Sequence, residues 1–295
     1  MSKLMKGHTF AKGKHKLNYP AVAEIKLDEI RCDVHLTRNR ETQCEPSELG
    51  RRVFTRSYAD KPLANTGHWD RGFSELMNDL EIGRIDCGIL VNRSYNDSYR
   101  WVRSTKGLPE DLRKPNTLVE FVLFDIPQFN SPYSERRFQV DAIAQAGRHY
   151  GIPFIRPERV DVFCEEDVHV AFDQARARNF EGLMVKDLSH VYELDKRIYG
   201  WLKVKPEDDA DGRITAVNRA YSIQGEPLDR AGSVSVECED GSICDVPGIA
   251  HDLGRLMLAH PEKFIGEWCE FSYMERDRQG GYRHPRFNRI REAKA

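Results

Sequence analysis

The stretch Trp201-Leu202-Lys203-Val204-Lys205-Pro206 marks the point where the character of the chain changes. Its alternation predicts a strand with Leu202 and Val204 on one face and two lysines on the other. Two ammonium groups on one face repel each other unless an anion lies between them, and a phosphate is the obvious candidate. Taken alone, such a motif is more typical of an exposed amphipathic edge strand.

The residues after Pro206 form a region of different composition. The acidic segment Glu207–Gly212 is predicted to be a linker and a hinge. Short alternating strands are then predicted over Arg213–Arg219, Ser233–Glu239 and Glu267–Met274, with a hairpin turn at Asp240-Gly241 and a helix over Ile249–His260. This pattern predicts a small β-barrel of roughly 85 residues.

The residues before Pro206 mix strand and helix patterns. Strands are predicted over Ala21–Ile25, Arg31–Leu36, Leu118–Ile126 and Gly182–Lys186. Helices are predicted over Phe73–Leu80, Arg136–Tyr150 and Glu166–Arg178. The sequence therefore predicts an α+β protein with two domains, residues 1–206 and 207–295.

The composition of the chain bears on whether it is a membrane, secreted or cytoplasmic protein. The chain has 295 residues with 45 Lys+Arg against 47 Asp+Glu, and a mean hydropathy of −0.63. No run approaches the roughly 18 apolar residues of a membrane span, and no apolar block follows the N-terminal lysines, so neither a membrane protein nor a secreted one is expected. Seven scattered cysteines without a CxxC pair predict reduced thiols and a cytoplasmic location.

Lys26 is the first candidate for chemistry. It ends the apolar strand in Ala23-Glu24-Ile25-Lys26-Leu27-Asp28, and Asp28 projects to the same side two residues on. A lysine attacks only as the neutral amine, so a lowered pKa or a neighbouring cation is required. The ordinary alternative is a surface lysine in a salt-bridged strand, and this is the more frequent case for the motif alone.

Two further motifs carry charge at the ends of strands. In Glu181-Gly182-Leu183-Met184-Val185-Lys186 a carboxylate precedes a predicted strand and a lysine ends it. The segment Tyr282–Lys294 holds five Lys/Arg and one acid, interleaved with apolar residues, and is either a basic tail or a packed segment.

Taken together and in this order, these motifs resemble the covalent nucleotidyltransferase superfamily, and within it the ATP-dependent DNA ligases of the small two-domain bacteriophage type. The resemblance covers nearly the whole chain. No single motif is specific, but five in order with a domain break after the double lysine are. The resemblance implies a nucleotidyltransferase (adenylation) domain over residues 1–206 and an OB-fold domain over 207–295.

The resemblance also implies roles for individual residues. Lys26 would attack the α-phosphate of ATP and carry AMP, with Asp28 beside it. The nucleotide would be bound by Glu24, Ile25, Arg31 and Phe121, and the phosphates by Lys186, Lys203 and Lys205. Phe121 would stack on adenine, although a core position is equally expected in so apolar a strand. The C-terminal Arg283, Arg286 and Lys294 would orient the pyrophosphate.

A divalent metal and a DNA partner follow from the same resemblance. Glu181 would hold Mg²⁺ (or Mn²⁺), and the metal and neighbouring cations would depress the pKa of Lys26. Nicked double-stranded DNA would be bound by a monomer, mainly through phosphate contacts, with Arg51, Arg52, Arg56 and Lys61 as the expected contributors. The net charge of −2 allows this partner because clustering decides the local potential.

The sequence departs from the family pattern at two positions. Glu29 stands where the family has glycine in Lys-x-Asp-Gly, and Gly88 stands where it has the acid of Asp-Gly-Glu. In one hypothesis the carboxylate has migrated, so that Glu29 does the work of the acid missing at Gly88, including contact with the metal. In the other hypothesis the site is degraded and the protein ligates poorly. The reciprocal gain and loss of an acid favours migration.

Other functions remain open on the sequence alone. An RNA ligase or an mRNA-capping guanylyltransferase would use the same lysine chemistry. A catalytically silent protein that binds nicks is the third alternative, and the intact Lys26, Glu181, Lys203 and Lys205 count against it.

Overall fold

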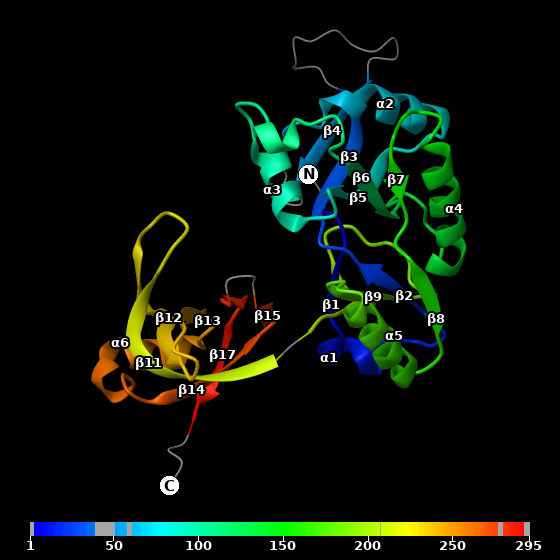
Figure 1. Ribbon diagram of the computed structural model, residues 1–295. Helices are drawn as coiled ribbons and strands as arrows, with labels where there is room; N and C mark the ends of the chain where they lie inside the picture. Colours follow the sequence, from blue (N-terminus) through cyan, green and yellow to red (C-terminus); the bar gives the residue numbers. More distant parts are fainter. Residues whose placement is uncertain (1–2, 39–50, 58–60, 207, 277–279, 292–295) are drawn as a thin grey trace. The chain divides into compact units, whose positions relative to one another are not determined.

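The computed structural model describes residues 3–38, 51–57, 61–206, 208–276 and 280–291, with the main chain alone described for residues 37–38 and 51–57. The chain divides into two compact units, Met1–Val204 and Lys205–Ala295, each with its own sheets (Figure 1). Among the described residues, no helix is long and apolar enough to cross a membrane.

One sheet of the first unit carries the strand that ends at Lys26. Its order is β1 (Lys6–Thr9), β10 (Arg197–Val204), β9 (Gly182–Asp187), β2 (Ala21–Lys26) and β8 (Arg159–Val162). Only β1 and β10 are parallel among these pairs. Alternate residues of β2, β9 and β10 are apolar, and they pack with α5 (Glu165–Ala177) and α1 (Phe10–Gly13) in one core cluster. The opposite face therefore carries the polar residues of these strands.

The second sheet of this unit has a separate core. Its order is β4 (Arg51–Ser57), β3 (Ile30–Arg38), β5 (Arg84–Val91), β6 (Val119–Asp125) and β7 (Phe154–Ile155). One face packs against α2 (Asp70–Asp79), α3 (Tyr95–Arg103) and α4 (Tyr133–Ala146) (Figure 1). Short 3-10 turns lie at Lys14–Lys16, Gly67–Trp69 and Glu110–Leu112.

The polar faces of the two sheets are turned toward each other. Phe124 on β6 packs with Met184 on β9 and Trp201 on β10, and the Lys186 Nζ atom on β9 donates to the Phe124 carbonyl at 3.2 Å. The candidate site lies between these two faces, within the first unit.

The second unit is built on β11 (Asp208–Tyr221), β12 (Pro227–Cys238), β13 (Ile243–Pro247), β14 (Trp268–Tyr273) and β17 (Arg286–Ile290). The sheet order is β13-β12-β11-β14-β17. The short pair β15 (Glu275–Arg276) and β16 (Tyr282–Arg283), the helix α6 (His251–Ala259) and a 3-10 turn at Pro261–Lys263 complete the unit. Its core gathers aliphatic and aromatic residues such as Val234 and Phe271.

Two predictions for this region need correction. Among the described residues no hydrogen-bonded pair closes the sheet from β13 to β17, so the predicted closed barrel is not confirmed. The predicted linker is wrong from Asp208 onward, because Asp208–Gly212 begins β11 and pairs with β14. Glu207 lies outside the described residues. Acidic residues and a glycine suggested a turn, but strand pairing across the sheet overrides that local preference.

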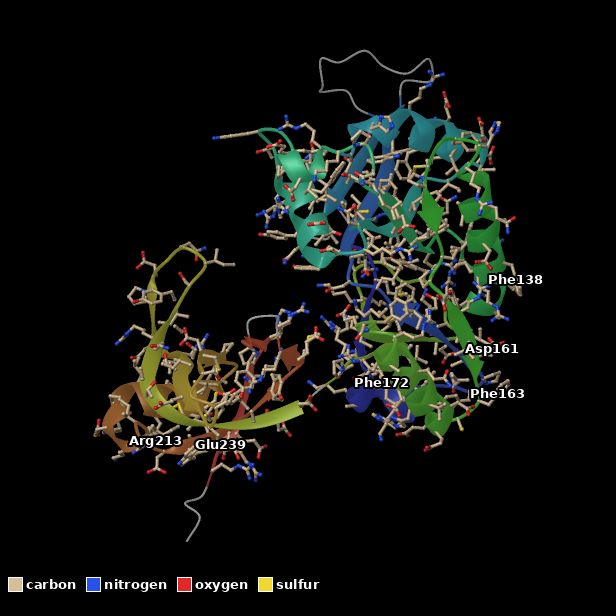
Figure 2. All side chains as sticks on the ribbon, viewed as in Figure 1. Phe138, Asp161, Phe163, Phe172, Arg213 and Glu239 are labelled. Carbon is tan, nitrogen blue, oxygen red and sulfur yellow. The ribbon has the colours of Figure 1, made fainter. Side chains whose placement is uncertain are left out.

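Two aromatic side chains of the first unit are exposed rather than packed. Phe138 on α4 is 61% exposed and Phe163, between β8 and α5, is 69% exposed (Figure 2). They lie away from the polar faces that carry the candidate site, and isolated exposed apolar residues are ordinary on protein surfaces.

Candidate active site

Lys26 and Glu181 meet because β2 and β9 are neighbours. The antiparallel register sets Lys26 opposite Gly182, and Glu181 directly precedes β9. The Lys26 Nζ atom donates to Glu181 Oε2 at 2.5 Å and to the Leu27 carbonyl at 3.3 Å. The lysine side chain is 17% exposed and the glutamate 6% exposed. The pair is therefore shielded from bulk water but still open to a ligand.

A cavity of about 360 Å³ opens beside this pair. Its apolar wall is formed by Ile25, Leu90, Ile155 and Phe180, and its charged wall by Lys26, Asp28, Arg93, Arg156, Glu158, Arg178 and Glu181. A volume of this size is at the lower end of the range for small-molecule sites, roughly 300–1,000 Å³. The sequence predictions for Ile25, Lys26, Asp28 and Glu181 thus fall on one cavity.

Carboxylates surround Lys26. Burial favours the neutral amine, but the negative charges of Glu29 and Glu181 outweigh it and raise the pKa of Lys26. The expectation from the sequence that a bound metal and neighbouring cations lower this pKa stays a prediction. Neutralisation of these acids by a bound cation would be needed to release the proton.

Glu24 and Lys186 are brought together away from the cavity. The Lys186 Nζ atom lies 2.7 Å from Glu24 Oε2, and both side chains are 1% exposed. Tyr133 donates its hydroxyl hydrogen to Glu24, and Arg156 lies 3.5 Å from the same carboxylate. Neither residue of this pair lines the cavity, so the structure does not place them where the resemblance implied a nucleotide contact.

Arg31 forms a salt bridge with a carboxylate on β5, the neighbouring strand of the same sheet. Its Nε and Nη2 atoms donate to both carboxylate oxygens of Asp86, at 2.9 and 2.5 Å. The hydroxyl of Tyr192 donates to Asp86 Oδ2 at 2.7 Å. This buried network fixes Arg31 on the polar face of the second sheet, beside Glu29.

Phe121 belongs to the core of the second sheet. Its side chain is fully buried and contacts Trp69, Phe73 and Phe154 edge-on, with ring centroids 5.1, 5.1 and 6.4 Å away. It does not line the cavity at Lys26. Of the two alternatives for this residue, the structure supports the core position. The aromatic residue of the cavity is Phe180, which the sequence analysis did not select.

The remaining predicted lysines and arginines are dispersed. Lys203 lies on β10 opposite Met184. Lys205 begins the second unit, where its Nζ lies 3.9 Å from Met274 Sδ. Arg283 pairs with Glu275 at 2.5 Å, and Arg286 is exposed on β17. Lys294 lies outside the described residues. Neither Lys186 nor Lys203 of the predicted phosphate path lines the cavity, and Lys205 belongs to the second unit.

The predicted DNA contacts begin on β4, at the edge of the second sheet. Arg51, Arg52 and Arg56 are paired in register with Arg38, Thr37 and Asp33 of β3. Their side chains lie outside the described residues, and Lys61 is exposed in the following segment. Their role as DNA contacts stays a prediction.

Glu29 occupies space beside Gly88. A Cβ atom built on Gly88 would lie 2.1 Å from Glu29 Cγ. The Oε2 atom of Glu29 is buried and has no hydrogen-bond partner, and burial raises the pKa of this carboxyl. Both Glu29 and Glu181 act electrostatically on Lys26.

No group of three or more candidate metal ligands is assembled among the described residues. Two carboxylates at Lys26 nevertheless fit a magnesium ion, because Mg²⁺ is commonly bound by one or two carboxylates together with substrate phosphates and water. The unpartnered oxygen of Glu29 has the chemistry of such a ligand. A magnesium ion held by these two carboxylates would therefore need a phosphate to supply further oxygen ligands.

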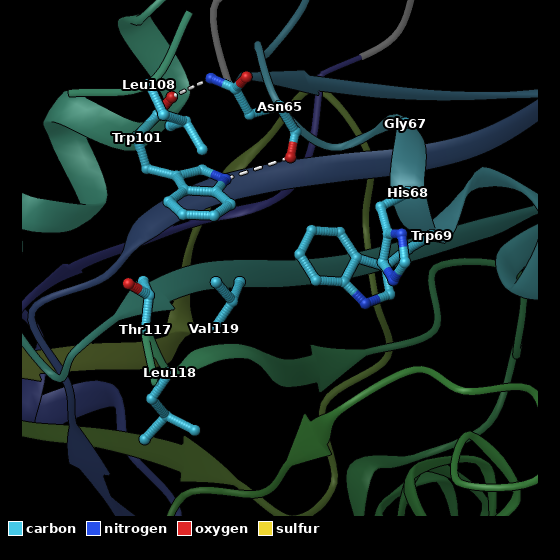
Figure 3. A pocket seen from close by; sticks show the side chains of 9 residues that line it. All are labelled: Asn65, Gly67, His68, Trp69, Trp101, Leu108, Thr117, Leu118 and Val119. Carbon is cyan, nitrogen blue, oxygen red and sulfur yellow. Dashed lines mark hydrogen bonds between the residues drawn. The ribbon is translucent and has the colours of Figure 1, made fainter. Parts of the chain in front are cut away.

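A second cavity, of about 600 Å³, lies on the first unit next to the loop around η2 (Gly67–Trp69). Its walls include Trp69, Trp101, His68 and Asn65, and Trp101 donates its indole N–H to the Asn65 carbonyl at 3.2 Å (Figure 3). No Lys, Arg, Asp or Glu lines it, so it lacks the charged side chains found in the cavity at Lys26.

The arginines of the cavity wall were missed by the sequence analysis. Arg156 and Glu158 flank Pro157 after β7, and Arg178 follows α5. Each arginine lies in a connecting segment, where no hydrophobic periodicity indicates which way a side chain projects. The charged run Arg156-Pro157-Glu158-Arg159 between two strands was the available signal.

Comparisons with known proteins find relatives among DNA ligases. Residues 79–205 match the family model described as the ATP dependent DNA ligase domain. A curated relative, the DNA ligase of Enterobacteria phage T3, is 34% identical over 148 residues, which covers 48% of this chain and 41% of the relative. The chain spans about two fifths of the length of the phage T3 and T7 relatives that it matches.

Solved structures confirm the fold. A structure from a study of Lig E DNA ligases is 18% identical, with a TM-score of 0.71, and 99% of this chain covers 100% of it. The ATP-dependent DNA ligase of bacteriophage T7 in complex with ATP is 21% identical, with a TM-score of 0.55 and 98% of each chain covered. These findings confirm the resemblance to ATP-dependent DNA ligases and the α+β fold.

Proposed function

We propose that the protein is an ATP-dependent DNA ligase that seals nicks between a 3′-OH and a 5′-phosphate in duplex DNA. The observation that carries this proposal is Lys26, whose amine faces Glu181 at 2.5 Å at the wall of a cavity of about 360 Å³. The family match and the phage relatives support the same activity. They do not favour an RNA ligase, a capping enzyme or a silent binding protein.

The first step transfers AMP from ATP to Lys26. The Lys26 ammonium first loses a proton, and Glu181 Oε2 is the nearest acceptor. The Nζ atom then forms a bond to the α-phosphorus, the bond from that phosphorus to the bridging oxygen breaks, and pyrophosphate leaves. The cavity wall of Ile155 and Phe180 suits the apolar faces of a purine, and the arginines suit the phosphates.

The later steps react first at the phosphorus of AMP and then at the phosphorus of the DNA 5′-phosphate. The 5′-phosphate of the nick attacks the lysyl-AMP, which breaks the P–N bond and gives adenylylated DNA. The 3′-OH then attacks the 5′-phosphate, forms the phosphodiester and releases AMP. Positioning and charge neutralisation carry most of such phosphoryl chemistry. Lys203, Lys205, Arg31 and the C-terminal Arg283, Arg286 and Lys294 remain proposed contributors of positive charge.

A divalent cation, Mg²⁺ or Mn²⁺, completes the proposed site. When bound it would neutralise phosphate oxygens and the carboxylates around the amine. Glu181 and Glu29 are the residues that would hold it. We further propose that residues 1–206 form the nucleotidyltransferase domain and residues 207–295 an OB-fold domain. We also propose that the protein acts as a monomer in the cytoplasm (the host cytoplasm for a viral protein).

Intact-mass analysis after incubation with MgATP tests the first step. We expect the protein to gain one AMP, and GTP to give no comparable adduct. Nicked duplexes with 5′-phosphate or 5′-OH ends then test the later steps, and only the 5′-phosphate should be adenylylated and sealed. Faster sealing of a nicked RNA duplex, or no AMP adduct at all, would contradict the proposed function.

A further inference from the structure

Glu29 and Gly88 compete for one space in the site. β3 and β5 are antiparallel, with Arg31 opposite Gly88, so the residue just before β3 reaches the neighbouring strand at this glycine. A Cβ atom on Gly88 would lie 2.1 Å from Glu29 Cγ and 3.2 Å from Phe124 Cζ. Gly88 is not in the left-handed region of φ. Space, rather than backbone conformation, is therefore what requires glycine here.

The carboxylate of Glu29 has no structural task that would explain its position. Its Oε2 atom is buried and has no hydrogen-bond partner. A buried carboxylate oxygen without a hydrogen-bond partner costs free energy, so its presence calls for an explanation such as a ligand or a reaction that uses it. Its negative charge, like that of Glu181, raises the pKa of Lys26 against the effect of burial. The group therefore faces the nucleophile as an acid that awaits a cation.

We propose that Glu29 is the second acidic ligand of the lysine site, reaching it from the turn before β3 through the space that Gly88 leaves free. Together with Glu181 it binds the divalent cation that accompanies the triphosphate. This inference rests on the proposed function and deepens it. It takes the side of migration in the sequence analysis, and the experiment below decides between the two hypotheses.

The filled space allows a reciprocal test. The variants are E29Q, E29G, G88E and the exchange E29G/G88E, with E165Q on the surface of α5 as the control for removing one negative charge. Binding of Mn²⁺ in the presence of a non-hydrolysable ATP analogue is followed by electron paramagnetic resonance. Formation of the AMP adduct is followed separately by intact mass. Thermal unfolding of every variant reports whether it folds.

We expect E29Q to weaken Mn²⁺ binding by about 10- to 100-fold, as loss of a metal ligand or its close support does. E165Q should bind Mn²⁺ like the unchanged protein. G88E alone should lower the thermal stability, because two side chains then occupy one space. In E29G/G88E the carboxylate returns from the other strand, so Mn²⁺ binding should exceed that of E29G by at least about 10-fold.

The outcomes separate the two levels of the proposal. If the unchanged protein forms no AMP adduct, the proposed function fails. If it forms the adduct but E29Q binds Mn²⁺ and reacts like the unchanged protein, the role of Glu29 is overturned and the function stands. A rise in adduct formation in E29G would also overturn it. If E29G/G88E folds but binds Mn²⁺ no better than E29G does, the proposal that the two positions share one space is overturned.

Discussion

Two lysine–glutamate pairs join β2 to β9, and they behave in opposite ways. Lys186 and Glu24 lie 2.7 Å apart with both side chains 1% exposed. Lys26 and Glu181 lie 2.5 Å apart but remain partly open at the cavity. The pairs use the same residue types, with Glu24 and Lys26 two residues apart on one face of β2, Lys186 on β9 and Glu181 just before β9. Their surroundings, and not their residue types, distinguish the closed pair from the pair that we propose to be reactive.

The surroundings differ in the balance of charge. Burial lowers the pKa of Lys186, although Glu24 opposes it. Tyr133 and Arg156 both contact the other oxygen of that carboxylate, Oε1. Lys26 has an excess of carboxylates instead, which raises its pKa. A closed, neutral network stabilises the sheet, whereas an open one with surplus negative charge is prepared for a cation.

Removal of the proposed nucleophile should have the largest effect. K26A should form no AMP adduct with MgATP, because no other side chain at the cavity offers an amine that can attack. Intact mass checks this, with circular dichroism as the control for folding. An AMP adduct of unchanged yield on K26A would show that another residue is the nucleophile. The contrast between the two lysine–glutamate pairs would then have no bearing on the reaction.

The closed pair should matter mostly for stability. K186M leaves Glu24 buried without its main partner, so the free energy of unfolding should fall by about 3–5 kcal/mol, as measured by urea denaturation. The free energy of unfolding should fall less in the matched variant K26M, because water from the cavity can reach the neighbouring Glu181. Equal losses of unfolding free energy in K186M and K26M would show that the two pairs contribute alike to stability.

The acid of the open pair should matter for the reaction. E181Q keeps the shape of the side chain but removes its charge, and adduct formation should slow by about 10²–10³-fold, as for loss of one preorganised charged or polar group in an active site. Single-turnover measurements with E165Q as control check this. A rate within a few-fold of the unchanged protein would assign the essential charge to another group.

Two phenylalanines give the smallest but most specific test. F121L should lower the free energy of unfolding by about 1–2 kcal/mol and leave the KM for ATP unchanged, since Phe121 lies in the core. F180L should raise the KM and change stability by less than about 1 kcal/mol, since Phe180 lines the cavity. A raised KM in F121L with an unchanged KM in F180L would indicate that Phe121, and not Phe180, contacts the adenine.

Local patterns predicted what depends on neighbours in sequence. Alternation along Trp201–Lys205 gave the correct strand, because the period of two reports which face is apolar. The strand ending at Lys26 and the helix over Glu166–Arg178 were predicted for similar reasons, and both are present within one or two residues. These segments bury one face against a single core, so their periodicity is clear.

Other features depend on partners that are distant in sequence. The role of Phe121 required the knowledge that β6 buries this ring beside Trp69 and Phe73. The strand at Asp208–Gly212 forms because β14 pairs with it, despite its acidic, turn-like composition. The reciprocal change at Glu29 and Gly88 was visible in the sequence, but only the register of β3 and β5 shows that the two positions share one space.

The parallel pairing of β1 with β10 has a consequence for synthesis on the ribosome. Lys6 is paired with Arg197, and β2 obtains its neighbour β9 only from residues 182–187. Strand pairs so far apart in the chain cannot form until nearly the whole first unit has left the exit tunnel. The nascent chain therefore carries Lys26 for most of its synthesis without Glu181 beside it. Assembly of the Lys26–Glu181 pair is a late event, coupled to completion of the unit.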